Sequence, residues 1–214
     1  MSSLLDLKEL REVFYAVKDP GPYSSDGNVI KSVDEWINSQ GTTRKKVFQL
    51  LIEEADESIY ACMLGLFYHH GIGVRADHSM AFNSYRFAAE SSNDAFAQNQ
   101  LGYCYRDGLG TIGSSEKAFE WFKKSAERGH ICGMRTLADH YYNGWGYEQN
   151  FRRAFFWYSK AYSNGNSRAI QGLFNCHEKG YGTQRDMHKA LYWAKKDQLI
   201  HWSFLPKLFK RRHY

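Results

Sequence analysis

Residues that interrupt helices or form disulfides are few in this 214-residue chain, which has three prolines and four cysteines. Pro20 and Pro22 stand together near the start, in a segment that we expect to be a loop. Because proline breaks the interior of helices and strands, its absence from the central part leaves that part free to form long regular elements. Strand-like alternation is also scarce, so the sequence predicts an all-α protein.

Long apolar runs are missing too, since no stretch approaches the roughly 20 residues that span a bilayer. Asp6 and Glu9 lie where a signal peptide needs an apolar core. We therefore expect no membrane span and a cytoplasmic protein.

Positive charge is concentrated at the C-terminus. Of the net charge of +5, four come from residues after Gln198, a stretch without carboxylates: Lys207, Lys210, Arg211 and Arg212. The nearly neutral remainder argues against nucleic acid as a partner, because a phosphate-binding surface needs clustered basic residues. The tail is interpreted most simply as the solvated side of a capping helix. Nuclear targeting, a membrane surface and an acidic partner are its alternative readings.

What the chain does contain is a repeat. One pattern recurs four times, opened by leucines at spacings of 37, 36 and 36 residues: Leu64, Leu101, Leu137 and Leu173. Seven residues after each leucine comes a Gly-x-Gly pair, beginning at Gly71, Gly108, Gly144 and Gly180. Glycine ends helices readily because it adopts positive φ without strain. A repeat of this period indicates a solenoid.

Helix-capping residues and small residues follow each glycine pair in register. Four residues past the second glycine stand side chains that can cap a helix: Asp77, Ser114, Asn150 and Asp186. Four further on come alanines, which allow close packing: Ala81, Ala118, Ala154 and Ala190. Each unit is therefore helix, glycine loop, helix and turn, with Asn93, Gly129 and Gly165 at the ends of second helices.

This repeated pattern of residues resembles that of the Sel-one-like repeat (SLR) family, a relative of the tetratricopeptide repeat. The second unit matches best, through Ala97 to Gly110 and Lys117 to Ala126. The resemblance implies a right-handed α-solenoid of about four helix-loop-helix repeats with helical caps at both ends. We assign residues 1–55 to an N-terminal helical cap, 56–198 to four repeats, and 199–214 to a C-terminal capping helix and basic tail.

The N-terminal cap is predicted to contain three helices. Leu4, Leu7, Leu10, Phe14 and Val17 fit one helical face, and Val29, Val33, Trp36 and Ile37 fit another. A third helix begins near Thr43, where Phe48, Leu51 and Ile52 can imitate a degenerate second helix under the first repeat. End units of solenoids must hide one apolar face, which explains atypical caps.

Cysteine placement favours a reducing compartment. All four cysteines lie in or just before first helices: Cys62, Cys104, Cys132 and Cys176. Secreted members of the SLR family, as the resemblance implies, join first helix to second by disulfides, which this pattern does not allow. We expect free thiols.

Patterns that suggest chemistry each have a simpler structural reading. Gly108 to Gly113 spells G-x-G-x-x-G, but it follows a helix rather than a strand, so we expect no nucleotide site. Cys104, His140 and Cys176 occupy equivalent positions in three repeats. Packed helices lie about 8–10 Å apart, too far for all three to reach one ion, so we expect packing roles and no metal or other cofactor.

The remaining candidate site is a surface. The resemblance implies that first helices line the concave side, where positions two, five and six after each leucine are not needed for packing. Together with the loop-tip residue Trp145, these positions predict a partner-binding set: Leu66, His69, His70, Tyr103, Arg106, Asp107, Asp139, Tyr142, Asn143, Trp145, Asn175 and Glu178. Tyrosine and arginine often anchor interfaces, so this mixture suits a protein or peptide. For the loop-tip column Ile72, Leu109, Trp145 and Tyr181, exposure and burial against the next unit stay equally open.

We therefore expect a non-catalytic scaffold or adaptor that binds a protein or peptide, with no enzymatic activity. A dedicated inhibitor or immunity partner of one protein is an alternative that the sequence does not separate from an adaptor. A hydrolase or penicillin-binding activity, as in secreted cysteine-rich relatives, is disfavoured because no nucleophile and base pair is found in the sequence.

Overall fold

The computed structural model describes residues 7–17, 27–53 and 58–196, and within these ranges it contains helices and no strands. The helices are α1 (Leu7–Val17), α2 (Gly27–Ser39), α3 (Arg44–Glu53), α4 (Ser58–His70), α5 (His78–Ser91), α6 (Ala95–Asp107), α7 (Ser115–Glu127), α8 (Ile131–Asn143), α9 (Phe151–Ser163), α10 (Ala169–Lys179) and α11 (Met187–Lys196). The all-α prediction is confirmed. The predicted C-terminal capping helix, the basic tail and the loop around Pro20 lie outside the described residues.

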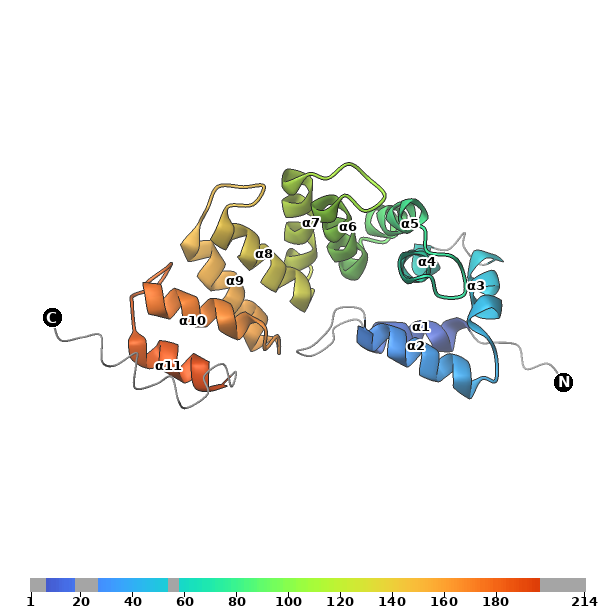
Figure 1. Ribbon diagram of the computed structural model, residues 1–214, viewed down its shortest axis with the longest axis horizontal. Coiled ribbons are helices and arrows are strands. Elements are labelled where there is room, and N and C mark those ends of the chain that lie inside the picture. Colours follow the sequence, from blue (N-terminus) through green and yellow to red (C-terminus); the bar gives the residue numbers. More distant parts are fainter. Residues whose placement is uncertain (1–6, 18–26, 54–57, 197–214) are drawn as a thin grey trace.

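Four antiparallel helix pairs, α4–α5 to α10–α11, follow one another along an arc (Figure 1) and form repeats 1 to 4. The two helices of each pair pack on each other, and each pair packs on the next pair. The first helices α6 and α8 also contact each other directly. The four leucines that open the repeats are all buried. An array of this kind is an α-solenoid, because each unit covers the apolar face of its neighbour.

Second helices begin where the sequence places their caps. Asp77, Ser114, Asn150 and Asp186 each accept a hydrogen bond from the backbone N–H three residues later, at 2.9–3.2 Å. First helices end at glycines with φ between 68° and 78°, and the predicted stops at Asn93, Gly129 and Gly165 also have positive φ. The cap predictions are confirmed.

A ring from the second helix packs on the first helix at a glycine. A Cβ added to Gly65 would lie 2.5 Å from the Tyr85 ring, and one added to Gly102 would lie 2.6 Å from the Phe122 ring. In repeat 3 the corresponding residue is Ala138, and the Tyr158 ring lies instead against Gly172 of repeat 4. In repeats 1 and 2 the glycine after the repeat leucine therefore leaves room for an aromatic ring of the second helix.

The second glycine of each loop joins one repeat to the one before. A Cβ on Gly110, Gly146 or Gly182 would lie within about 2.0 Å of a backbone oxygen at the start of the preceding second helix, that of His78, Ser115 or Phe151. Gly73 of repeat 1 makes the same approach to the Arg44 oxygen, at the start of α3. The start of α3 thus contacts the loop of repeat 1 in the same way as the start of α5 contacts the loop of repeat 2.

Within α3, Phe48 and Leu51 are buried, and the Phe48 ring contacts those of Phe67 and Tyr68. Ile52 is 46% exposed, so its predicted role in this packing is wrong. It lies one residue past Leu51 and therefore points away from the face that α3 buries.

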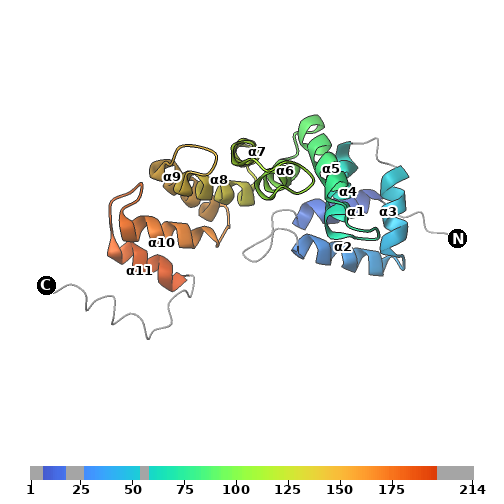
Figure 2. The same cartoon turned by 45° about the horizontal axis from the view of Figure 1, so that its top comes forward.

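The two helices α1 and α2 form an antiparallel pair, called here the N-terminal hairpin, that leaves the line of the array. Figures 1 and 2 both show it on the inner side of the arc, beside the first repeats. The Phe14 ring of α1 meets the Phe96 ring of α6 edge to face, with centroids 5.6 Å apart. The members of the predicted apolar faces whose burial is described are buried, including Leu10, Phe14, Val29, Val33 and Ile37. Leu4 lies outside the described residues, and the burial of Val17 is not described.

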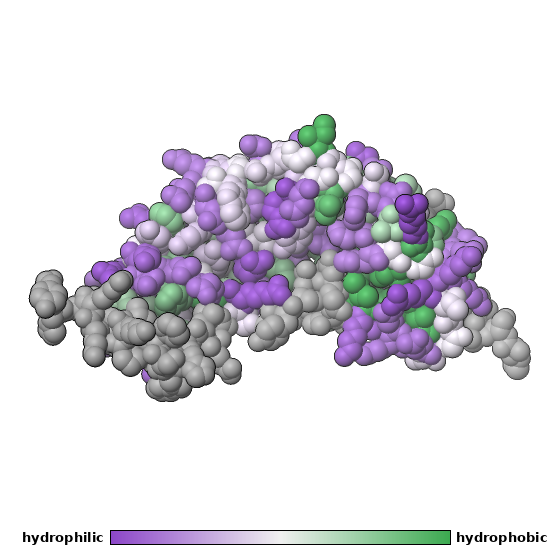
Figure 3. Space-filling view, in the orientation of Figure 1, coloured by the Kyte–Doolittle hydropathy of each residue, from purple (hydrophilic) through white to green (hydrophobic). Residues whose placement is uncertain are grey.

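Apolar surface visible in Figure 3 gathers over the N-terminal helices, whereas the visible surface over α8 and α9 is largely hydrophilic. No described helix combines the length and the apolar character needed to cross a bilayer.

Candidate interaction surface

Positions two before and two, five and six after each repeat leucine form one face of a first helix, which we call the first-helix stripe. Residues four and three apart on a helix lie on the same side, so the members of each stripe are neighbours. In repeat 3 the stripe consists of Arg135, Asp139, Tyr142 and Asn143. The predicted partner-binding set belongs to this stripe, apart from Trp145.

The stripe changes from buried to open along the array. Leu66 of repeat 1 is 0% exposed, so in this structure it is not open to a partner, contrary to its prediction as an accessible residue. The half-buried members are His69, Tyr103, Asp139, Tyr142, Asn175 and Glu178, and the exposed members are His70, Arg106, Asp107 and Asn143. The accessible part of the stripe therefore includes His70 at the end of the first helix of repeat 1 and lies mainly in repeats 2 to 4.

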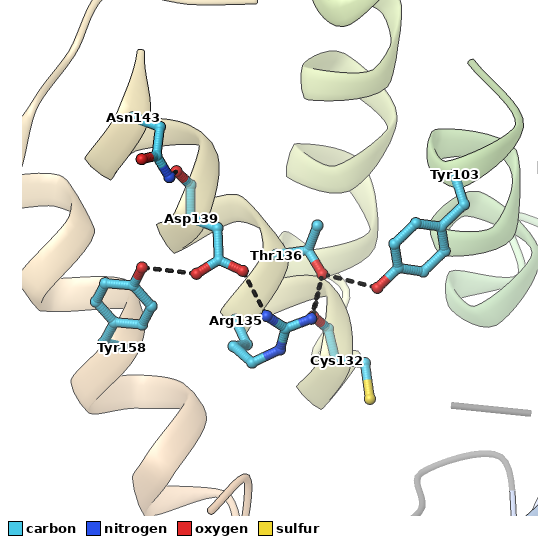
Figure 4. Close-up of polar contacts among 7 residues, drawn as sticks. All are labelled: Tyr103, Cys132, Arg135, Thr136, Asp139, Asn143 and Tyr158. Carbon is cyan, nitrogen blue, oxygen red and sulfur yellow. Dashed lines mark hydrogen bonds and ion pairs between the residues drawn. The ribbon is translucent and has the colours of Figure 1, made fainter. Parts of the chain in front are cut away.

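A chain of hydrogen bonds crosses the stripe from repeat 2 to repeat 3 (Figure 4). The Tyr103 hydroxyl lies 3.1 Å from the Thr136 hydroxyl, which itself donates to the Cys132 carbonyl and therefore accepts from Tyr103. Arg135 donates to the Thr136 hydroxyl at 3.4 Å and is ion-paired with Asp139. The contacts fix the Arg135 guanidinium on the surface of α8.

The chain ends on the second helix of repeat 3, where the Tyr158 hydroxyl donates to Asp139 at 2.6 Å (Figure 4). Burial, together with the neighbouring Asp139 carboxylate, raises the pKa of Tyr158, so this hydroxyl remains a donor at neutral pH. Asp139 thus accepts from two directions and holds α8 to α9.

Arg106 lies beside this chain on α6. Its guanidinium sits 4.7 Å from the centroid of the Tyr103 ring and pairs with Asp107 at 2.7 Å. The side-chain hydrogen bond to Asp107 raises the pKa of Arg106. Tyr103 joins the two arginines, since Arg106 lies over its ring and Arg135 donates to the Thr136 hydroxyl that its own hydroxyl contacts. Two arginines and one tyrosine therefore gather where repeats 2 and 3 meet.

Tyr142 is less available than the sequence predicted. Its ring contacts those of Phe151, Tyr158 and Tyr181, with centroids 5.5–6.3 Å apart. It therefore joins repeat 3 to the loop of repeat 4 and also lies at the edge of the stripe.

The stripe residues of α10 make contacts within their own helix. Glu178 pairs with Lys179 at 3.4 Å, and Asn175 accepts a hydrogen bond from Gln171 at 3.3 Å.

Among the loop-tip residues, some are buried or half-buried and one is exposed, so both of the alternatives from the sequence occur. Ile72 is buried and Leu109 and Tyr181 are half-buried, whereas Trp145 is 50% exposed. The Tyr181 ring stacks on Phe151 of the preceding second helix at 4.2 Å. Sequence reasoning missed Ile112, which is 90% exposed on the loop of repeat 2.

The column Cys104, His140 and Cys176 is buried, as its packing role predicts. His140 Nδ1 lies 2.9 Å from the Trp145 carbonyl, and burial lowers the pKa of His140, so the neutral ring donates this bond. Burial raises the pKa of the Cys176 thiol to about 12. In the described part of the chain, no three His, Cys, Asp or Glu side chains are grouped as metal ligands.

Comparisons with known proteins agree with this architecture. The model of the Sel1 repeat matches residues 58–93, 95–130, 133–166 and 167–196. A Sel1 repeat protein from Oxalobacter formigenes is similar in structure, with a TM-score of 0.70 and 24% identity, covering 91% of this chain and 80% of that one.

A second solved structure is a protective antigen of uropathogenic Escherichia coli strains that displays an SLR fold. Its TM-score is 0.66 and its identity 25%, over 91% of this chain and 38% of the antigen. Comparison with curated protein sequences gives no significant match.

The stacked pairs and their register define a helical repeat protein of the α-solenoid class. The chain belongs to the Sel1 repeat family, since the four matched segments cover more than half of its length. Sel1 repeat proteins are generally protein–protein interaction scaffolds, and their fold is typically non-catalytic.

Proposed function

We propose that this protein is a non-catalytic scaffold that holds a protein or peptide partner along the first-helix stripe of repeats 2 to 4, on the concave side of the array. The observation that carries the proposal is the group formed by Arg106, Tyr103 and Arg135. These side chains are partly exposed, come from two repeats and are fixed by their own hydrogen bonds and ring contacts.

Preorganisation of this group favours binding. Arginine and tyrosine carry much of the energy of protein interfaces, and side chains that are already ordered lose little entropy when a partner arrives. Beyond them the stripe offers amides and paired charges at Asn143, Asn175 and Glu178. Such a mixture suits the backbone and polar side chains of a polypeptide.

We propose that residues 1–55 form the N-terminal cap, with α3 as a half-repeat because Gly73 approaches it as Gly110 approaches α5. Residues 56–198 would then form the four repeats.

The test uses the two exposed stripe residues Arg106 and Asn143. Partners captured on the wild-type protein are identified and purified, and the strongest binder is titrated against the double variant Arg106→Ala with Asn143→Ala. We expect a loss of at least thirtyfold in affinity, equal to about 2 kcal/mol, with unchanged thermal unfolding.

Arg86→Ala is the matched control, because Arg86 is an exposed arginine on the second helix α5. It should bind as the wild type does. If the folded double variant binds with wild-type affinity, the stripe is not the binding surface.

A further inference from the structure

Equivalent positions of the stripe differ sharply in exposure between the two ends of the array. Two residues before the repeat leucine, Cys62 is 0% exposed and Asn99 is 1% exposed. At the same position in repeats 3 and 4, Arg135 is partly exposed and Gln171 is exposed. Something therefore covers this position of the stripe in repeats 1 and 2 and does not reach it in repeats 3 and 4.

The N-terminal hairpin is placed to be that cover. It lies on the inner side of the arc beside these repeats (Figures 1 and 2), and Phe14 of α1 touches Phe96 of α6. Phe96 is one helical turn before Asn99, so the two residues share a face of α6. Leu10 and Phe14, four residues apart on α1, are both fully buried in the same core cluster as Cys62 and Leu66.

The covered part of the stripe is apolar in repeat 1, unlike its equivalent in repeat 3. Cys62 and Leu66 take the places of Arg135 and Asp139. An apolar face on a first helix binds another apolar face, whereas the paired charges of repeat 3 are adapted to water. The apolar residues at these positions of repeat 1 are thus suited to contact with the apolar face of another helix.

One polar group under this cover is left unsatisfied. Neither the amide nitrogen nor the amide oxygen of Asn99 has a hydrogen-bond partner, although the side chain is buried. The indole nitrogen of Trp36, in the hairpin itself, is buried and unpartnered as well. Burying such groups without partners costs free energy, so the closed arrangement is less stable than its apolar contacts alone would make it.

We propose that the buried part of the stripe, formed by Cys62 and Leu66 of repeat 1 and Asn99 of repeat 2, is a docking surface for an amphipathic helix, and that the N-terminal hairpin is its intramolecular occupant. A competing partner helix would present an aliphatic and an aromatic residue four apart, as Leu10 and Phe14 do, and a polar group that bonds to the Asn99 amide. This inference goes beyond the scaffold proposed above, which concerns the open stripe of repeats 2 to 4.

Cys62 reports whether the surface is covered. In the full-length protein, Phe14→Ala removes the ring that contacts Phe96 and should loosen the hairpin. We expect the thiol of Cys62 to be labelled by a maleimide at least tenfold faster than in the wild type, as mapped by peptide mass spectrometry. The buried thiols of Cys104 and Cys176 should stay protected, because their repeats remain folded.

Phe87→Ala is the matched control, since Phe87 is a half-exposed phenylalanine on the second helix α5. It should leave Cys62 protected. If Phe14→Ala leaves Cys62 protected, the hairpin does not control access to the stripe. If Phe14→Ala and Leu10→Ala both expose Cys104 and Cys176 as well, the hairpin is an inseparable part of the core and the proposal is wrong.

The docking itself is tested with a synthetic peptide of residues 7–39 as the probe. It should bind the Phe14→Ala protein at least tenfold more tightly than the wild type, where the attached hairpin competes at high effective concentration. A peptide that itself carries Phe14→Ala should bind neither protein. Equal binding to both proteins, or no binding to the loosened one, would overturn the proposed surface.

This peptide experiment is independent of the open stripe. Adding Arg106→Ala and Asn143→Ala to the loosened protein should leave peptide binding unchanged. A tenfold loss from these changes would mean that the peptide sits on the stripe of repeats 2 to 4, against the present inference.

Discussion

At the scale of single residues, the glycine after the repeat leucine is a packing residue rather than a hinge. Gly102 lies inside α6, where alanine would ordinarily favour the helix by about 1 kcal/mol. Its hydrogen atom instead makes room for the Phe122 ring.

Gly102→Ala should therefore destabilise the protein by about 1–3 kcal/mol, because the added methyl group would lie 2.6 Å from the ring. Urea unfolding followed by circular dichroism measures the effect. Gly113→Ala is the control, since a Cβ there would make only ordinary contacts at 3.5 Å or more. A Gly102→Ala protein as stable as the control would show that the ring shifts at no cost.

Residue by residue, the sequence predicts the core well and the candidate site poorly. The leucines, alanines and capping residues were identified because each recurs in register and has one physical role. The chain through Arg135, Thr136 and Tyr158 was missed, since it depends on side-chain directions across two repeats. The spacing of four between Arg135 and Asp139 was the available signal.

At the scale of elements, each second helix begins at a side chain that binds its free N–H groups. Ser114 accepts from the Lys117 N–H at 3.2 Å and is the N-cap of α7. The neighbouring Ser115 is exposed in the first turn and caps nothing.

Ser114→Ala should lower the free energy of unfolding by about 1 kcal/mol, through the loss of this cap. Ser115→Ala should change it by less than about 0.5 kcal/mol, as surface substitutions usually do. Thermal unfolding of the two variants side by side provides the measurement. Equal effects of the two substitutions would contradict the assignment of the cap to Ser114.

Element positions were predictable for the repeats, and the three N-terminal helices were predicted as well. Where the hairpin goes was not, because an apolar face on α1 indicates burial without naming the surface that buries it. The burial of Leu66 was not predicted for the same reason, since its register places it on the stripe and it lies in one core cluster with Leu10 and Phe14 of the hairpin.

At the scale of the whole molecule, the array is held together where a loop glycine meets the backbone of the preceding repeat. Gly146 makes this contact between repeats 2 and 3. Since each unit touches mainly its neighbours, one weakened junction should divide the cooperative unfolding of the array.

Gly146→Ala combines positive φ with a Cβ that would overlap the Ser115 carbonyl. Gly165→Ala shares the positive φ, at 97°, but has no atom within 4 Å of the added Cβ. In both variants, backbone strain should lower the free energy of unfolding by about 1–2 kcal/mol. In Gly146→Ala, overpacking should lower the free energy of unfolding by at least about 2 kcal/mol more.

Differential scanning calorimetry should show the wild type and Gly165→Ala unfolding in one transition. Gly146→Ala should show two, as repeats 3 and 4 separate from the rest. A single transition in Gly146→Ala, with the stability of Gly165→Ala, would show that this junction does not couple the repeats.

The direct contact between α6 and α8 also sets a measuring scale for whatever lies across them. Helices in contact are about 8–10 Å apart. An extended polypeptide advances about 3.3 Å per residue, so it would meet equivalent positions of successive repeats with every third side chain. A helical polypeptide rises about 1.5 Å per residue and would need about five to seven residues for the same distance. The spacing of the anchoring residues along a bound segment would thus distinguish an extended ligand from a helical one.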